Sequence, residues 1–283
     1  MMRARRLRLA FVVMMIWMGV GDRAVASGAP GASEITTARD LLVALETADE
    51  GVSTLQAGVR YIRRMALQGD EQTRQGRLYF EQIPNKSGGA ARRLFAVYFD
   101  TLYVDARKER DRQDWVFTGA WLIERRPDVK QYVARQLAPP GRQIDPLKLG
   151  EGPLPIPIGQ KAADVLSRYD VKLVNPHAGL EEESGGVQEF VQDTWQLRLT
   201  PKAGGAVGTD GADGGEYREI RLWYDRASLL PRLAKTISRS GDEAFVMLVN
   251  IRVNDKIKGD VFTIKQPDKA DGWDVQIEEY RGK

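Results

Sequence analysis

Few residues of this chain could carry out covalent chemistry. It has a single His, His177, and no Cys, which excludes thiol nucleophiles, disulfides, zinc ribbons and iron–sulfur clusters. His177 follows Asn175-Pro176 and comes two residues before Gly179, a turn composition that predicts an exposed imidazole. Relays and metal sites that need two His residues are impossible. We therefore expect that the protein is not an enzyme.

Other polar groupings also lack the pattern of a known site. The acidic run Glu181–Glu183 has neither the spaced oxygen ligands nor the glycine of a calcium loop. The Gly-rich stretch 203–216 lacks the Gly-x-x-x-x-Gly-Lys pattern of a phosphate loop, which favours a flexible hairpin loop. Arg92-Arg93 and Arg125-Arg126 could bind an anionic head group or form ordinary solvated surface. We expect no cofactor and no metal.

The N-terminus has the composition of an export signal. Four arginines between Arg3 and Arg8 precede the apolar run Leu9–Val20, and Ala24-Val25-Ala26 follows. This order predicts a signal peptide over residues 1–26, cleaved after Ala26. The alternative, a transmembrane anchor, needs about 20 apolar residues. We expect a periplasmic protein with one domain over residues 27–283.

Removing that signal changes the charge of the protein. The whole chain has 42 Lys+Arg and 39 Asp+Glu, and residues 1–26 contain five Arg and one Asp. The mature chain then has 42 − 5 = 37 basic and 39 − 1 = 38 acidic residues, a net charge of −1. This balance removes the main support for nucleic-acid binding.

Short apolar runs bounded by Gly, Asn, Asp and Pro dominate the chain beyond Gly51 and predict antiparallel strands. Within Trp195–Thr200 the alternation places Trp195, Leu197 and Leu199 on one face. Strands are predicted at residues 55–64, 76–82, 93–100, 115–118, 121–125, 130–134, 171–174, 195–200, 219–225, 231–238, 244–253 and 262–265.

Only two helices are predicted beside these strands. The first begins near Thr36–Asp40, where the capping residues stand, and presents Leu41, Leu42, Leu45 and Ala48 on one side. The second covers residues 160–166. Between the two groups of strands, six prolines and four glycines within residues 139–159 predict a structured loop or a lid.

Two helices cannot cover the apolar side of about a dozen strands that stay flat, so the sheet must curl. We predict a mainly β protein, an open antiparallel half-barrel of roughly a dozen strands with helices covering an apolar cavity. Such a cavity is typical of a small-molecule or lipid site. The alternative is a packed β-sandwich without a cavity.

Several segments, taken in order, resemble the periplasmic outer-membrane lipoprotein carrier family, the LolA-like proteins. The order extends from about Ala38 to Asp268, and Leu199–Lys202 and Phe262–Pro267 are its most specific parts. One family feature is missing, an arginine directly before a proline, because Ile83 precedes Pro84 here. The resembling segments are Leu41–Leu45, Val52–Ala57, Gly76–Phe80, Gly119–Leu122, Asp128–Gln131, Trp195–Lys202, Val253–Ile257 and Val261–Pro267.

The resemblance implies a carrier that holds the acyl chains of a lipoprotein, or of a related lipid, in the half-barrel and moves them toward the outer membrane. Its implied partners are an inner-membrane release complex and an outer-membrane acceptor. We expect a monomer. The alternative function is a sensing or interaction module of the same fold that passes a signal to a membrane partner.

The strand pattern and the resemblance together select candidate site residues, which we divide into cavity lining and lid. The lining candidates are Leu78, Phe80, Trp121, Trp195, Leu197, Leu199, Ile220 and Leu222. The lid candidates are Leu41, Leu42, Leu45, Pro153, Leu154, Pro155 and Ile156. A one-residue slip would reverse the facing of any strand.

Overall fold

A computed structural model describes residues 35–85, 91–105, 107–139, 141–142, 144, 147, 149, 158–202 and 217–280. Three predictions fall outside these residues: the signal peptide 1–26, the Gly-rich loop 203–216, and the lid candidates Pro153, Leu154, Pro155 and Ile156. In the part of the chain that is described, no helix is long and apolar enough to cross a membrane.

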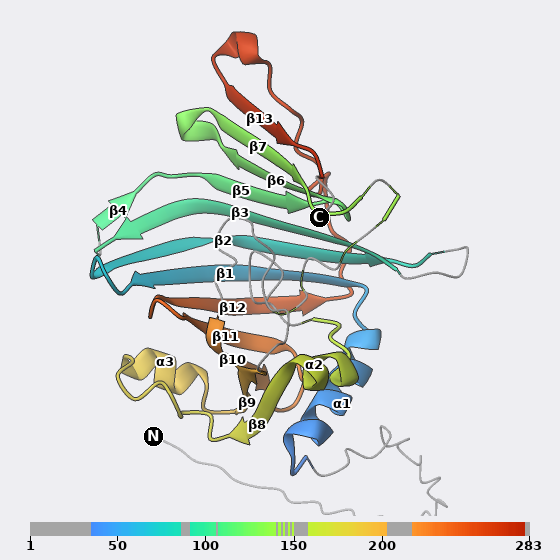
Figure 1. The fold of residues 1–283 in the computed structure, drawn as a ribbon, viewed down its shortest axis with the longest axis vertical. Helices are drawn as coiled ribbons and strands as arrows, with labels where there is room; N and C mark the ends of the chain where they lie inside the picture. Colours follow the sequence, from blue (N-terminus) through green and yellow to red (C-terminus); the bar gives the residue numbers. More distant parts are fainter. Residues whose placement is uncertain are drawn as a thin grey trace, which may run out of the picture. The chain divides into compact units, whose positions relative to one another are not determined.

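One 13-stranded sheet forms the body of the described chain (Figure 1). Its strand order is β13-β7-β6-β5-β3-β2-β1-β12-β11-β10-β9-β8, and the short β4 pairs with β3. The ends of this order, β13 and β8, are far apart, so the sheet is an open half-barrel. The strands are β1 Thr54–Met65, β2 Asp70–Ile83, β3 Arg92–Val104, β4 Arg107–Glu109, β5 Gln113–Phe117, β6 Trp121–Arg126, β7 Gln131–Gln136, β8 Tyr169–Val174, β9 Thr194–Pro201, β10 Tyr217–Asp225, β11 Pro231–Ser238, β12 Glu243–Val253 and β13 Asp274–Glu278.

Three α-helices accompany the sheet, α1 Ala38–Glu50, α2 Ala162–Arg168 and α3 Gly185–Phe190. Helix α1 begins with a capping box, because the Thr37 side chain accepts from the Asp40 N–H and Asp40 accepts from the Thr37 N–H. Two short 3-10 helices, Pro127–Val129 and Lys269–Asp271, lie in connections near β7 and β13.

The strand register defines two faces of the sheet. We call the face on which α1 and α2 pack the inner face and the other the outer face. Side chains alternate along a strand, so residues paired in register across neighbouring strands share a face. One inner row crosses β8 to β1 through Leu173, Leu197, Leu222, Ala234, Val246 and Tyr61. A second crosses β1 to β6 through Leu55, Phe80, Phe95, Phe117 and Leu122.

The outer face is covered at both ends by irregular segments. Leu180, Val187, Phe190 and Val191, in and around α3, pack on the outward side chains of β10 to β12 and β1. Phe262, Ile264 and Trp273, from the segment between β12 and β13, pack on the outward side chains of β3, β5, β6 and β7. The helices visible near the lower strands in Figure 1 therefore belong to different faces.

The mainly β, open half-barrel architecture predicted from the sequence is confirmed. The predicted strand at 262–265 is wrong, because Phe262 and Ile264 lie in an irregular segment that packs on the outer face. Strand β13 was not predicted, and its pairing with β7 is parallel. Val275 and Ile277 alternate with polar residues over only five positions, and Ile277 is 51% exposed, so β13 is a short strand at the edge of the sheet with a single buried residue.

Candidate functional site

The half of the inner face nearest α1 is one apolar cluster that contains most of the predicted lining. Four of the lining candidates are at most 1% exposed, and Trp195 is partly buried beside them. Leu41, Leu42 and Leu45 of α1 pack into the same cluster, together with Val165 of α2 and Leu149. The four fully buried candidates are Leu197, Leu199, Ile220 and Leu222.

The other half of the inner face forms a second cluster around the predicted Leu78 and Phe80, each 1% exposed. Here the sheet is covered by Leu147 and Ile158, which come from connections and not from a second sheet. In both halves the lining side chains touch side chains of the chain itself. The inner face is therefore closed in this conformation.

Trp121 is the one lining candidate on the wrong face. Its neighbour Leu122 pairs with Phe117 in an inner row, so Trp121 points outward. There it packs with Tyr132, Ala134 and Ile264 in an outer cluster. The prediction placed this strand one residue out of phase, and such a shift exchanges the two faces.

We call α1 together with residues 158–168 the inner cover. Its two parts are joined by carboxylates of α1. The Gly159 N–H donates to Asp49 Oδ2 (2.5 Å), and the Ala162 N–H, at the first position of α2, donates to Glu46 Oε2 (3.0 Å). These two hydrogen bonds join helix α1 to the 158–162 segment.

An arginine connects this cover to the sheet. Arg93 of β3 donates to the Gly159 carbonyl (3.2 Å) and to Gln82 Oε1 (3.3 Å) on the neighbouring β2. Gly159 has φ +70°, and a Cβ at this position would collide with the Arg93 guanidinium. Arg93 is therefore the sheet residue that reaches the cover at this end of β2 and β3.

Asp49 is a buried carboxyl group whose ionised form is disfavoured by its surroundings. Its carboxyl is 9% exposed, and burial raises its pKa to about 6, although the Gly159 N–H and the Arg93 charge both act in the opposite direction. Burial, and after it the Asp49 charge, raises the pKa of Tyr224, which faces the same region from β10. An ionised carboxylate at this point works against the closed cover.

A cavity of about 550 Å³ lies beside β12, where its pairing with β11 ends. Strands β11 and β12 are paired only from Leu233 and Met247 to Ile237 and Glu243, and β12 has a bulge beyond that point with Asn250 at φ 52°. The volume of the cavity is in the range of small-ligand pockets. Both faces contribute to it, since Phe190 and Leu248 belong to opposite clusters. The lining is Phe190, Asp225, Ser228, Leu230, Arg232, Leu248, Val249, Asn250 and Ile251.

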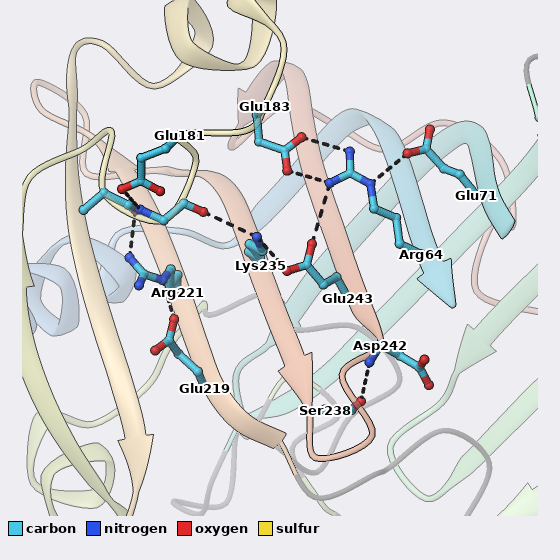
Figure 2. A network of polar contacts seen from close by, with 12 residues as sticks. Arg64, Glu71, Glu181, Glu183, Glu219, Arg221, Lys235, Ser238, Asp242 and Glu243 are labelled. Carbon is cyan, nitrogen blue, oxygen red and sulfur yellow. Dashed lines mark hydrogen bonds and ion pairs between the residues drawn. The ribbon is translucent and has the colours of Figure 1, made fainter. Parts of the chain in front are cut away.

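The outer face of β10 to β12, β1 and β2 carries an ionic network in addition to its apolar cluster (Figure 2). Arg64 donates to both oxygens of Glu183 (2.5 and 2.9 Å) and to Glu71 (2.8 Å). Arg221 donates to the Ala178 carbonyl (2.7 Å), and Lys235 lies 2.9 Å from Glu243. These contacts fix the segment around α3, which we call the outer cover, residues 175–193.

The pKa directions in this network follow its pairing. The hydrogen bond from Arg64 lowers the pKa of Glu183 despite its burial. Burial would raise the pKa of Glu219, but the hydrogen bonds from Arg221 and Arg198 outweigh it and the pKa is lowered. His177 lies exposed in the outer cover, with Nδ1 2.9 Å from Gln188 Oε1. No group of three or more His, Asp or Glu suited to a metal ion occurs among the described residues.

No family model and no curated protein matches this chain. An uncharacterized conserved protein from Thermus thermophilus is similar in structure, with 13% identity, a TM-score of 0.41 and coverage of 86% of this chain and 99% of that one. MucB in the MucA/MucB complex of Pseudomonas aeruginosa has 18% identity and a TM-score of 0.39. The match covers 80% of this chain and 60% of that one. A LolA superfamily protein from Nitrosomonas europaea has 14% identity and a TM-score of 0.32, with coverage of 78% of this chain and 96% of that one.

The lipoprotein carrier family that the sequence resembles is thus represented among similar solved structures. TM-scores of this size mark a distant likeness. What the protein does has to follow from its own residues.

Proposed function

We propose that this protein binds the acyl chains of a lipoprotein or a related lipid on the inner face, with the inner cover as a movable lid. The observation that supports this is the continuous apolar inner face, whose rows cross from β8 to β6 and whose cover consists of helices and connections. A permanent hydrophobic core would be equally apolar. A carrier differs from it in that the inner cover moves away from the inner face when the ligand binds.

The energetics allow such an exchange. Burying one CH2 group is worth about 0.8 kcal/mol, so a chain of about fifteen methylenes gains roughly 12 kcal/mol before the cost of moving the cover is subtracted. Leu41, Leu42 and Leu45 contribute only apolar contacts to the inner face. An acyl chain can replace those apolar contacts in kind, whereas the hydrogen bond from Arg93 to the Gly159 carbonyl has to pass to water when the cover moves.

The sharpest test compares two buried leucines from the two covers, using a fluorescent fatty acid as probe. Leu42→Ala weakens the inner cover and Leu180→Ala weakens the outer cover, and both residues are at most 5% exposed. Deleting a buried leucine costs about 2–5 kcal/mol. If the inner cover is a lid, Leu42→Ala increases the open population and raises probe affinity about tenfold or more, whereas Leu180→Ala lowers stability alone.

Hydrogen exchange of the α1 amides should separate lid opening from global unfolding in the Leu42→Ala protein. Exchange that accelerates in α1 while β1 stays protected supports the lid. Equal loss of stability in both variants, with no probe bound by either or by the parent, would reject the carrier.

We further propose that the carrier works in the periplasm without catalysis, passing its cargo from an inner-membrane release complex to an outer-membrane acceptor. The export signal at residues 1–26 supports the location. Intact mass of the exported protein should correspond to residues 27–283. Mass spectrometry of an organic extract of the protein, purified from a native periplasm, would identify the cargo.

The competing function is an interaction module that signals to a membrane partner. It predicts that a protein is captured whether or not an acyl chain is bound. A carrier should lose its lipid on meeting the acceptor, so lipid release in the presence of outer-membrane extract distinguishes the two.

A further inference from the structure

Near the end of the inner face where β3 leads into β4, three buried N–H donors have no hydrogen-bond partner among the residues that the structure describes. They are Arg74 Nη1 on β2, Trp115 Nε1 on β5 and Arg126 Nε on β6. Trp115 is 8% exposed. A buried donor without an acceptor costs free energy, and three of them on nearby strands call for an explanation.

Their neighbours place these donors together. Trp115 lies edge-on to Phe99 (5.5 Å between ring centroids) and to Tyr61 (6.2 Å), and Tyr61 pairs in register with Arg74. Arg74 and Arg126 share one carboxylate, Asp111, at 2.7 and 3.6 Å. The donors therefore border an aromatic wall that belongs to the inner apolar cluster.

The charges of this group do not balance. Two guanidinium groups meet the one carboxylate of Asp111, and the side chains of Arg74 and Arg126 are 14% and 39% exposed. Solvent therefore reaches one side of the group. Glu124, the register partner of Trp115, is itself paired with Arg135 (2.6 Å). Of the arginine pairs noted in the sequence, Arg125 binds Asp114 and Arg93 binds the cover, so Arg126 is the member with a free buried donor.

The missing acceptor is best supplied by an anion with several oxygens. Guanidinium groups match phosphate and carboxylate geometry, and hydrogen bonds to charged groups are the strong ones. Three donors on three side chains suit the oxygens of a phosphate group better than the two of a carboxylate. The adjoining Tyr61, Phe99 and Trp115 rings suit the first methylenes of an attached chain.

We propose that Arg74, Trp115 and Arg126 form a subsite for a phosphate group, placed so that a phosphate-bearing amphiphile lays its acyl chain along the inner face. The acyl part rests on the proposed function, whereas the phosphate part stands on the three donors. Free phosphate would present the same chemistry, so the experiment has separate arms for the two sources.

The probes are lysophosphatidic acid, the monoacylglycerol with the same acyl chain, and inorganic phosphate alone, each titrated calorimetrically. Lysophosphatidic acid should bind at least tenfold more tightly than monoacylglycerol, and its affinity should fall with added salt. Trp115→Phe removes the indole N–H and keeps a smaller aromatic ring at this position. This substitution should weaken the binding of lysophosphatidic acid about fivefold and leave the binding of monoacylglycerol unchanged.

Arg126→Gln, at the more exposed of the two arginines, should weaken the binding of lysophosphatidic acid about tenfold. The matched control is Arg77→Gln, an exposed arginine of β2 whose register partner on β1 is Gly58, on the outer face. It should change neither affinity. Circular dichroism of each variant confirms that it is folded.

Equal affinities for the two amphiphiles, unchanged by Trp115→Phe, overturn the phosphate subsite and leave the acyl carrier standing. Binding of inorganic phosphate that depends on Trp115 and Arg126, with no amphiphile bound, supports the subsite and overturns its lipid ligand and the carrier together. Binding of none of the three probes overturns both.

Discussion

The two covers of the sheet are held by different forces. The outer cover is fixed by ion pairs and by donors from the sheet, such as Arg64 to Glu183 and Trp223 Nε1 to the Pro176 carbonyl (2.7 Å). The inner cover packs through leucines, and its carboxylates, Glu46 and Asp49, bind within the cover itself. A lipid can replace leucine contacts but cannot replace a buried ion pair. The difference supports the proposal that a ligand enters at the inner face.

The largest expected effect tests whether the inner face is closed without ligand. Leu197 is 0% exposed and packs in the cluster that contains the α1 leucines. Leu197→Ala should therefore cost about 4 kcal/mol of unfolding free energy, measured by urea denaturation. An open cavity beside it would reduce the cost to about 1 kcal/mol. Leu67→Ala, at a 91% exposed leucine, is the control.

A second variant removes a side chain that binds the outer cover to the sheet. Arg64→Ala leaves the Glu183 side chain, 8% exposed, without its bidentate partner. Removing one partner of a buried pair costs about 3–5 kcal/mol, and since Arg64 itself is 36% exposed we expect about 3 kcal/mol. Acyl-probe affinity should not change. Tighter probe binding in this variant would show that the outer cover is also a lid. Arg60→Ala, at an exposed arginine of β1, is the matched control.

The third prediction concerns pH and sharpens the role of Asp49. Its folded pKa of about 6 lies above its ordinary value of 3.8, so the protonated form is favoured in the folded state. Stability from this group is therefore gained as pH falls from above 6 to below 4, by up to roughly 3 kcal/mol for a shift of this size. Asp49→Asn mimics the protonated form and should be more stable than the parent at pH 7.5.

The Asp49→Asn advantage should vanish by pH 4, measured as the difference between the two proteins at each pH. Taking this difference removes the opposite contributions of Glu183 and Glu219, whose lowered pKa values cost stability in acid. An advantage that stays constant from pH 4 to 7.5 would show that Asp49 is not the titrating group.

The smallest effect is expected at His177. This residue is exposed in the outer cover, away from the inner face. Replacing it with Ala should leave lipoprotein localisation within about twofold, since loss of a general base typically costs 10²–10⁴. A loss of a hundredfold would contradict the proposal of a carrier without catalysis.

Sequence patterns predicted the strands that alternate cleanly and failed where tertiary contacts decide. Alternation alone places Leu197 with Leu199 and Ile220 with Leu222 on a shared face of each strand, and the structure shows that this face is the inner one. Trp121 was misplaced because both faces of β6 carry apolar residues, so alternation could not choose between them. Arg74, Trp115 and Arg126 were not predicted as a group, since 52 residues and two strands of the sheet order separate them. The neighbouring Arg125-Arg126 pair was the one signal available.

By itself the sequence determined the class of the fold, the capped helix at Thr37 and the absence of cysteine chemistry, because these depend on residue types and on short-range periodicity. Only the tertiary structure decided which face α1 covers, that Asp49 meets Gly159 across 110 positions, and that Phe262 and Ile264 pack outside instead of forming a strand. Contacts of this kind depend on how thirteen strands are ordered and registered. That order is set by the total burial of both faces, which no local window of sequence contains.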